Sequence, residues 1–276
     1  MEALVNQPES ADSRTIQAVV FDAVGTLISP NPSVTEIYRA AVRQFCGIEL
    51  AAETVRSVIH TALRERSSGG DLRTSERAEH EFWERLVLQL CSGQHDPMNA
   101  HRETRNVANS KARECFRYLF EHFGLARHWQ VFPDVAETLR RLQNMGIKVA
   151  MASNFDQRLA AVCQGLTELS PVSQVFISSA IGYRKPARRF FDAVAQRMDL
   201  SPNQILMVGD DFDNDIDGAV RSGFRAAWIC RVPADGVLPD GSFLKLSTLS
   251  PLPELIRDGK LPDAADAAVP SEGPGT

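Results

Sequence analysis

The residues with the clearest chemistry are five carboxylates within eight positions, directly after the apolar run ILMVG at residues 205–209. They are Asp210, Asp211, Asp213, Asp215 and Asp217. Acids this close together repel one another, so a bound cation would stabilise them at neutral pH. Carboxylate oxygens in this number suit Mg²⁺. The run therefore predicts a magnesium site at the end of a buried strand.

A calcium-binding loop is the competing interpretation of the same run. Residues 213–218 match the first half of the helix–loop–helix calcium pattern. The second half fails, because Phe224 stands where that pattern requires Glu. The element before the acids also has the character of a strand, whereas the calcium pattern begins on a helix.

A second candidate is Asp22, within VVFDAVGTL at residues 19–27. An apolar strand here ends in a carboxylate and then a Gly-Thr turn. Ligands of α/β sheets bind at the carboxyl ends of strands. A carboxylate at that edge could attack phosphorus or carbon and form a covalent intermediate. The plainer alternative is an Asp that caps the following turn.

Two further motifs carry groups that suit a phosphoryl ligand. Ser153 and Asn154 follow a strand at residues 147–151, where a hydroxyl and nearby N–H groups could hold phosphoryl oxygens. Either residue could instead simply cap the next helix. Lys185 stands just before Pro186, at the start of another helix. Its ammonium could neutralise a nucleophile and a transferred group, or it could be one more exposed cation among neighbouring arginines.

These motifs lie on segments that alternate between strand and helix character. Short apolar runs at 147–151, 175–178, 205–208 and 226–229 are typical of central parallel strands. Amphipathic segments lie between them, and this alternation indicates a parallel sheet with crossover helices. We therefore predict an α/β fold with a Rossmann-like core.

A long helical zone separates the first strand from the others. We predict helices near 33–45, 52–65, 76–91 and 99–123, and no strand among them. The predicted organisation is a core of residues 15–28 plus 128–258 and an inserted helical cap at 29–127. Residues 1–14 and 259–276 are expected to be disordered tails, because their composition is polar and rich in small residues.

Composition and charge limit the possible partners. The formal net charge of −5 argues against nucleic acids and anionic membranes as partners. No apolar stretch is long enough to cross a bilayer, and residues 1–14 lack the plan of a signal peptide. The five cysteines are odd in number and scattered, which favours reduced thiols in a cytoplasm. The oligomeric state cannot be read from the sequence.

Taken together, the four motifs resemble those of the haloacid dehalogenase-like (HAD) superfamily, in the same order and at the same strand ends. The resemblance extends over residues 17–229. The helical insert between the first two motifs is similar to the cap of subfamily I, which includes phosphoglycolate phosphatase and β-phosphoglucomutase. The resemblance implies a Mg²⁺-dependent phosphatase acting on a small phosphorylated molecule.

The resemblance also implies a role for each matching residue. Asp22 would be the nucleophile and a metal ligand, and the backbone carbonyl of Val24 a second ligand. Asp210 would ligate the metal directly, and Asp215 directly or through water. Ser153 would bind the phosphoryl group with Asn154 beside it. Lys185 would balance the charge on Asp22 and on the transferred group.

Val24 departs from the pattern of the superfamily's phosphatases, which carry a second Asp at this position. That Asp protonates the leaving group and then activates water, and loss of such help typically costs about two to four orders of magnitude in rate. Dehalogenases of the superfamily also lack it, but they do not keep the carboxylate-rich fourth motif. Phosphonate-cleaving members need a cap lysine, and Lys111 is the single lysine of residues 29–127.

Three interpretations therefore remain open. The first is a phosphatase, slowed at proton transfer, that uses another residue or acts on esters with good leaving groups. The second is a different hydrolytic reaction that uses Asp22. The third is a phosphoryl-ligand or protein-binding module that keeps the metal but has lost turnover.

Overall fold

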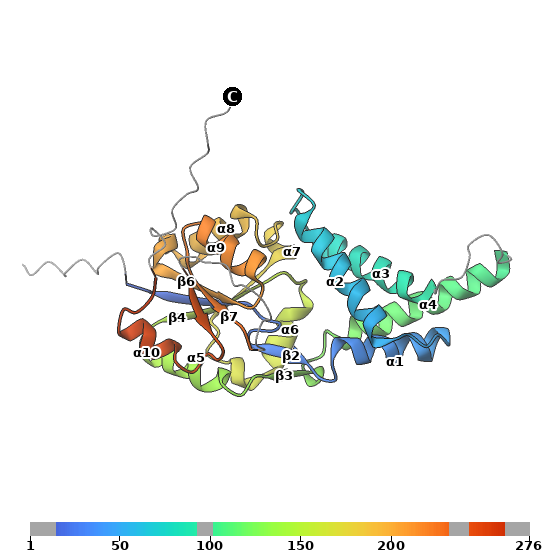
Figure 1. The fold of residues 1–276 in the computed structure, drawn as a ribbon, viewed down its shortest axis with the longest axis horizontal. Helices are drawn as coiled ribbons and strands as arrows, with labels where there is room; N and C mark the ends of the chain where they lie inside the picture. Colours follow the sequence, from blue (N-terminus) through green and yellow to red (C-terminus); the bar gives the residue numbers. More distant parts are fainter. Residues whose placement is uncertain (1–14, 93–101, 232–242, 263–276) are drawn as a thin grey trace, which may run out of the picture.

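A parallel sheet forms the centre of the protein (Figure 1). The computed structural model describes residues 15–92, 102–231 and 243–262 of the chain. The sheet has six strands in the order β5-β4-β1-β6-β7-β8, and every neighbouring pair is parallel. The strands are β1 (Ala18–Phe21), β4 (Lys148–Ser153), β5 (Gln174–Ile177), β6 (Ile205–Gly209), β7 (Arg225–Ile229) and β8 (Leu244–Leu246). The predicted α/β fold class is confirmed.

Side chains of the central strands alternate between two apolar layers. Val19 and Phe21 of β1 pack on one face, with α5 (Val135–Asn144), α6 (Arg158–Gly165) and α10 (Leu252–Arg257). Ala18 and Val20 pack on the other face, with α8 (Arg188–Met198) and α9 (Gly218–Arg221). Successive strand residues point to opposite faces, so a continuous apolar run suits a strand covered on both sides.

The short α7 (Ser178–Ile181) follows β5, and four further helices form a separate apolar cluster to one side of the sheet (Figure 1). They are α1 (Val34–Cys46), α2 (Ala52–Ser68), α3 (Glu76–Ser92) and α4 (Arg102–His122). We call this group the cap helices. Ser33 and Glu36 form a capping box at the start of α1, and Gly47 ends the helix in the left-handed conformation. The predicted helices at 33–45 and 76–91 lie close to α1 and α3.

Two short antiparallel strands join the cap helices to the sheet. In β2 (Ile28–Pro30) and β3 (Trp129–Val131), Ile28 pairs with Val131 and Pro30 with Trp129. The chain therefore leaves and re-enters the core at neighbouring points, as Figure 1 shows. This pairing holds together two segments about a hundred residues apart in sequence, and these segments connect the first and last of the cap helices to the core.

The last described residues belong to the core. Leu261 is buried within the apolar layer that contains α10, although the sequence suggested a disordered tail from residue 259. Gly259, Lys260 and Pro262 are also described, whereas residues 1–14 and 263–276 of the two predicted tails lie outside the described part of the chain. None of the described helices is long and apolar enough to span a membrane.

Candidate active site

Three neighbouring strands bring the predicted site residues to one edge of the sheet. Asp22 follows β1, Ser153 ends β4, and Asp210 follows β6. Strand β1 lies between the other two and is parallel to both, so all three carboxyl ends meet at the same edge. Residues from distant parts of the sequence therefore face a common space.

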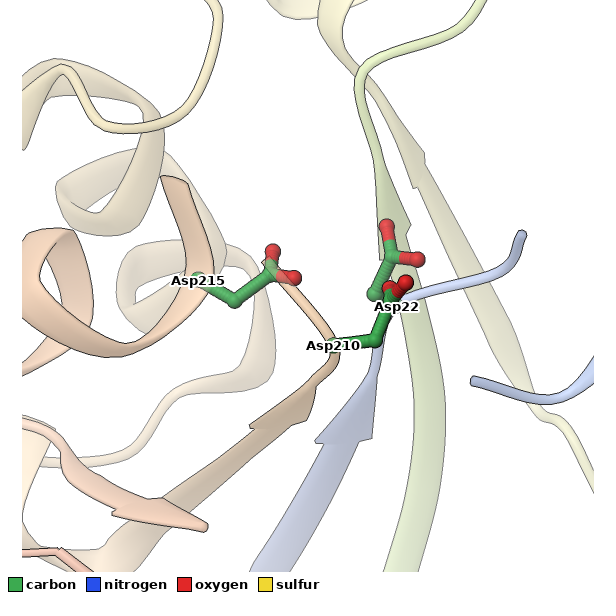
Figure 2. Close-up of side chains that lie close together, drawn as sticks. All are labelled: Asp22, Asp210 and Asp215. Carbon is green, nitrogen blue, oxygen red and sulfur yellow. The ribbon is translucent and has the colours of Figure 1, made fainter. Parts of the chain in front are cut away.

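Three carboxylates gather at this edge (Figure 2). One oxygen each of Asp22, Asp210 and Asp215 lies within 4.8 Å of the others. Asp215 reaches the group from a π-helical turn at Phe212–Asp217, and its carboxylate lies against the backbone of Gly209. A Cβ at Gly209 would come within 2.1 Å of an Asp215 oxygen, so glycine is required at this position.

The other acids of the crowded run have different environments. Asp211 accepts hydrogen bonds from the backbone N–H and the side-chain amide of Asn214. Asp217 forms an ion pair with Arg221, and Asp213 is exposed. The sequence predicted a cation site from all five acids, but two of them join Asp22 in the cluster.

Lys185 connects two of the three carboxylates. Its Nζ atom lies 2.7 Å from Asp22 Oδ1 and 2.6 Å from Asp215 Oδ1, and it also donates to the carbonyl of Ala152 at 2.7 Å. Its three N–H groups therefore have three acceptors. The side chain is 1% exposed, which excludes the alternative of a solvated surface lysine.

The charges of the cluster are strongly coupled. Burial disfavours the charge on Lys185, but the carboxylates of Asp215 and Asp22 outweigh this effect and raise its pKa above the ordinary value. Burial raises the pKa of Asp215 well above its usual range, and Lys185 opposes that rise in part. Desolvation and the nearby Asp22 charge raise the pKa of Asp210 to about 7.

These features fit a divalent cation. The cluster has three carboxylates and one lysine, which pairs with two of them, so negative charge is in excess when all are ionised. Burial is the main cause of the raised pKa values of Asp210 and Asp215, and repulsion from the Asp22 carboxylate adds to it, so a further positive charge would favour the ionised forms. The donors are hard oxygen atoms, the type that Mg²⁺ prefers. The cluster could therefore hold Mg²⁺.

The turn after Asp22 is shaped around Asp210. Gly25 has φ +92°, and a Cβ there would come within 2.1 Å of an Asp210 oxygen. Thr26 donates its hydroxyl to Asp210 Oδ1 at 3.3 Å, and Trp228 donates its indole N–H to the Asp210 carbonyl at 3.0 Å. Gly25 thus meets both a conformational and a space requirement. Sequence reasoning did not single out Thr26 or Trp228. Both donate to Asp210, which lies 184 residues after Thr26 and 18 residues before Trp228, so neither contact leaves a local signal in the sequence.

Ser153 and Asn154 have different hydrogen-bonding states. Ser153 is buried, and its hydroxyl forms no hydrogen bond with the described residues, so it remains free for a ligand. Asn154 donates its amide to the Lys185 carbonyl at 2.9 Å and accepts from the Lys185 N–H at 2.8 Å. Asn154 therefore fixes the backbone of Lys185. This arrangement favours a positioning role over the direct substrate contact expected from the sequence.

Val24 is half-buried and packs against the apolar layer of the core. It stands two positions after Asp22 in the sequence and forms an isolated bridge with Ile28. Its side chain has no titratable group, so the proton-transfer position of the phosphatase pattern is apolar in this protein. Lys111, considered for phosphonate cleavage, is exposed on α4.

One buried charge close to the site was missed. Arg184, which precedes Lys185, is 5% exposed, although the sequence analysis considered it only as a neighbour of Lys185. The neighbouring Arg188 and Arg189 are indeed on the surface. Sequence type alone gives no signal for the difference, because all three arginines stand within six positions of one another.

Comparison with known proteins gives a consistent result. Residues 16–223 match the family described as haloacid dehalogenase-like hydrolase. The mouse protein named haloacid dehalogenase-like hydrolase domain-containing protein 3 is 31% identical over 83% of this chain and 92% of its own length. The ribulose-1,5-bisphosphate 5-phosphatase of Halopiger xanaduensis is 31% identical over 75% of this chain and 82% of its own.

Solved structures show the same fold. The putative HAD-hydrolase YfnB from Bacillus subtilis has a TM-score of 0.61 and 16% sequence identity, covering 88% of this chain and 99% of its own. The family match spans most of the chain and includes Asp22, Lys185 and the acidic cluster. This protein belongs to the haloacid dehalogenase-like hydrolase family.

Proposed function

We propose that the protein is a Mg²⁺-dependent phosphatase that acts on a small phosphorylated molecule through an aspartyl-phosphate at Asp22. One observation carries the proposal: Asp22, Asp210 and Asp215 lie within 4.8 Å of one another, and buried Lys185 bridges Asp22 and Asp215. This arrangement combines a nucleophile, a cation site and a fixed positive charge. The phosphatase relative from Halopiger xanaduensis supports the same reaction class.

In the proposed mechanism, an Asp22 oxygen attacks phosphorus while the bond between phosphorus and the ester oxygen breaks. Lys185 holds Asp22 in place and offsets the negative charge that collects around the transferred group. Ser153 donates its free hydroxyl to a phosphoryl oxygen. Water then attacks the phosphorus of the aspartyl-phosphate, which releases phosphate and regenerates Asp22.

The cation site would be formed by Asp22, Asp210, the backbone carbonyl of Val24 and, directly or through water, Asp215. Bound Mg²⁺ would supply positive charge that orients the phosphoryl group and stabilises its developing charge. A backbone carbonyl does not depend on the side chain at position 24, so this ligand is present although Val stands where the superfamily's phosphatases carry Asp. Gly25 and Gly209 leave room for the Asp210 and Asp215 carboxylates.

Val24 limits the reaction at its proton transfers. A leaving alkoxide needs a proton, and the attacking water must lose one, yet the valine can do neither. We therefore propose that turnover is faster for substrates whose leaving group departs without protonation, such as acyl phosphates. A catalytically impaired protein that binds phosphoryl ligands is the second candidate, and the apolar Val24 side chain is the observation that favours it.

A phosphate-release screen over phosphomonoesters, acyl phosphates and phosphonates tests the proposal, with Mg²⁺ and with chelator. We expect release that requires Mg²⁺ and is abolished by Asp22→Asn. Asp213→Asn is the matched control, because Asp213 is an exposed member of the acidic run outside the cluster. Release that persists in Asp22→Asn would reject the nucleophile. Absence of release with every ester would favour the binding module.

A further inference from the structure

Arg184 lies where the cap helices meet the core. Its backbone N–H donates to the Leu72 carbonyl at 2.9 Å, and its Nη1 donates to the Arg66 carbonyl at 3.2 Å. Leu72 and Arg66 belong to the end of α2 and the turn after it, whereas Arg184 immediately precedes Lys185. The guanidinium is therefore enclosed between the cap helices and the segment that supplies the central lysine.

The nearby acids are already engaged by other donors. Arg66 donates to both oxygens of Glu79, each at 2.7 Å, and Thr74 donates to one of them at 2.6 Å. Asp211 accepts two hydrogen bonds from Asn214. Arg184 forms no ion pair with any described residue, and the carbonyl of Arg66 is the one acceptor of its guanidinium among them.

A buried guanidinium in this state is unusual, because buried charges in proteins are normally paired. Desolvation and the nearby Arg66 charge lower the pKa of Arg184 to about 10, and the attraction of Glu79 and Asp211 does not offset this effect. The positive charge is thus poorly compensated by the protein itself. An arginine retains its charge and offers a planar set of donors that matches carboxylate and phosphate oxygens.

A second unpaired polar group lies at the same contact. Asn214 Oδ1 is buried without a hydrogen-bond partner, and the Asn214 amide reaches Ser67 at 3.5 Å. Ser67 follows Arg66, whose carbonyl binds Arg184, and Asn214 lies in the turn after Asp210. The contact between α2 and this turn therefore borders the acidic cluster and contains both an uncompensated donor and a free acceptor.

We propose that Arg184 binds a second anionic group of the substrate, so that the substrate class is a small phosphomonoester that also carries a carboxylate or another phosphate. This inference rests on the proposed phosphatase function. The phosphoryl group to be transferred would occupy the acidic cluster with Lys185, and the second anion would contact the Arg184 guanidinium beneath the cap helices. Arg184 would determine specificity and take no part in bond breaking.

Matched substrate pairs test this proposal. Glycerol 3-phosphate and 3-phosphoglycerate differ by a carboxylate, and fructose 6-phosphate and fructose 1,6-bisphosphate differ by a phosphate. We expect wild type to have a higher kcat/KM for the two-anion member of at least one pair, and the pair affected identifies the anion. Arg184→Gln should lower that value at least about tenfold, chiefly through KM, since the contact is made equally before and during the reaction.

Two variants separate specificity from structure. Arg184→Lys should recover part of the lost affinity, because it restores the charge without the planar fork. Arg188→Gln is the matched control, because Arg188 is an exposed arginine four positions away, and both members of each pair should be unaffected. For Arg184→Gln, the one-anion substrates and p-nitrophenyl phosphate should change less than about twofold.

A binding measurement keeps the inference independent of turnover. In an Asp22→Asn background with Mg²⁺, calorimetry should show tighter binding of fructose 1,6-bisphosphate or 3-phosphoglycerate than of its one-anion partner, and Arg184→Gln should remove the difference. If no ester is hydrolysed but this difference is present, the proposed function fails and the anion site stands. The proposal would be overturned if Arg184→Gln lowered kcat/KM equally for all substrates, or lowered the melting temperature without changing the preference for two-anion substrates. Either result would mean that Arg184 only stabilises the contact between the cap helices and the core.

Discussion

Replacing Lys185 by Met tests whether the buried lysine holds the acidic cluster together. Methionine has a similar length but no charge and no donor. The change removes three hydrogen bonds of 2.6 to 2.7 Å and leaves the carboxylates of Asp22 and Asp215 facing each other without a cation. Removing one partner of a buried ion pair typically costs about 3–5 kcal/mol. Because the lysine serves two buried acids, we expect a loss in that range in the free energy of unfolding.

Urea denaturation in the presence of chelator measures the loss without compensation from Mg²⁺. Lys260→Met is the control, since Lys260 is exposed and pairs with Asp258 at the surface. Such surface pairs contribute about 0–1 kcal/mol. Adding Mg²⁺ should recover part of the stability of the Lys185 variant, because a bound cation replaces some of the missing positive charge.

A double-mutant cycle identifies the origin of the effect. Asp215→Asn removes one of the two charges that Lys185 neutralises, so the lysine should contribute less in that background. The cost of Lys185→Met should fall by about 1–3 kcal/mol when Asp215 is already Asn. A cost below about 1 kcal/mol in the wild type, or a strictly additive cycle, would refute the reasoning, because it would show that the lysine does not stabilise these carboxylates.

Three further changes probe the turn after Asp22 and the cation site. Val24→Asp should raise the rate of phosphate release from alkyl phosphates by about a hundredfold or more, with a smaller gain for p-nitrophenyl phosphate; a slower variant would mean that another residue supplies the proton. Asp210→Asn should abolish the rise in melting temperature that Mg²⁺ gives the wild type, and an equal rise in both proteins would place the ion elsewhere. Gly25→Ala should destabilise the protein by about 2–5 kcal/mol, because a positive φ costs about 1–2 kcal/mol and forced overlap with Asp210 a further 1–3. Gly47→Ala, also at positive φ but without neighbours within 4 Å, should show the first cost alone in thermal melts.

The core was predictable because its signals are local. Strands β1, β4 and β6 are apolar runs that end in polar residues, and each run is long enough to identify without knowledge of its partners. Parallel pairing then brings their carboxyl ends together. The shared edge that carries Asp22, Ser153 and Asp210 follows from these two facts alone.

The short strands were not predictable in the same way. β2 and β3 have three residues each, and β2 ends in a proline, which normally argues against a strand. They pair only because the cap helices return the chain to its starting point. β8, also of three residues, similarly forms by pairing with β7. A strand this short carries no periodicity of its own, so its partner determines whether it forms.

The cysteines show the same limit. Their spacing in the sequence is wide, and all five are free thiols as expected. In the fold, however, Cys46, Cys91 and Cys115 belong to the same apolar cluster of the cap helices. Cys91 interacts with both of the others. The contact with Cys115 and burial raise the pKa of the Cys91 thiol well above its usual value, and the hydrogen bond with Cys46 opposes that rise in part. Proximity of this kind depends on helix packing, which spacing does not reveal.

The contrast between Lys185 and Val24 separates two tasks of the site. Lys185 is buried against two acids from distant segments, and Gly25 and Gly209 lack side chains where the acids need room. An arrangement of like charges at a partly buried site opposes folding unless opposite charges offset it. In the proposed mechanism, these features hold a metal ion and a phosphoryl group. Proton transfer, by contrast, needs a titratable side chain, and position 24, where the resemblance to the superfamily's phosphatases implies Asp, is Val. The structure therefore separates charge stabilisation, for which the residues are in place, from proton transfer, and this is why Val24→Asp should alter rate far more than metal binding.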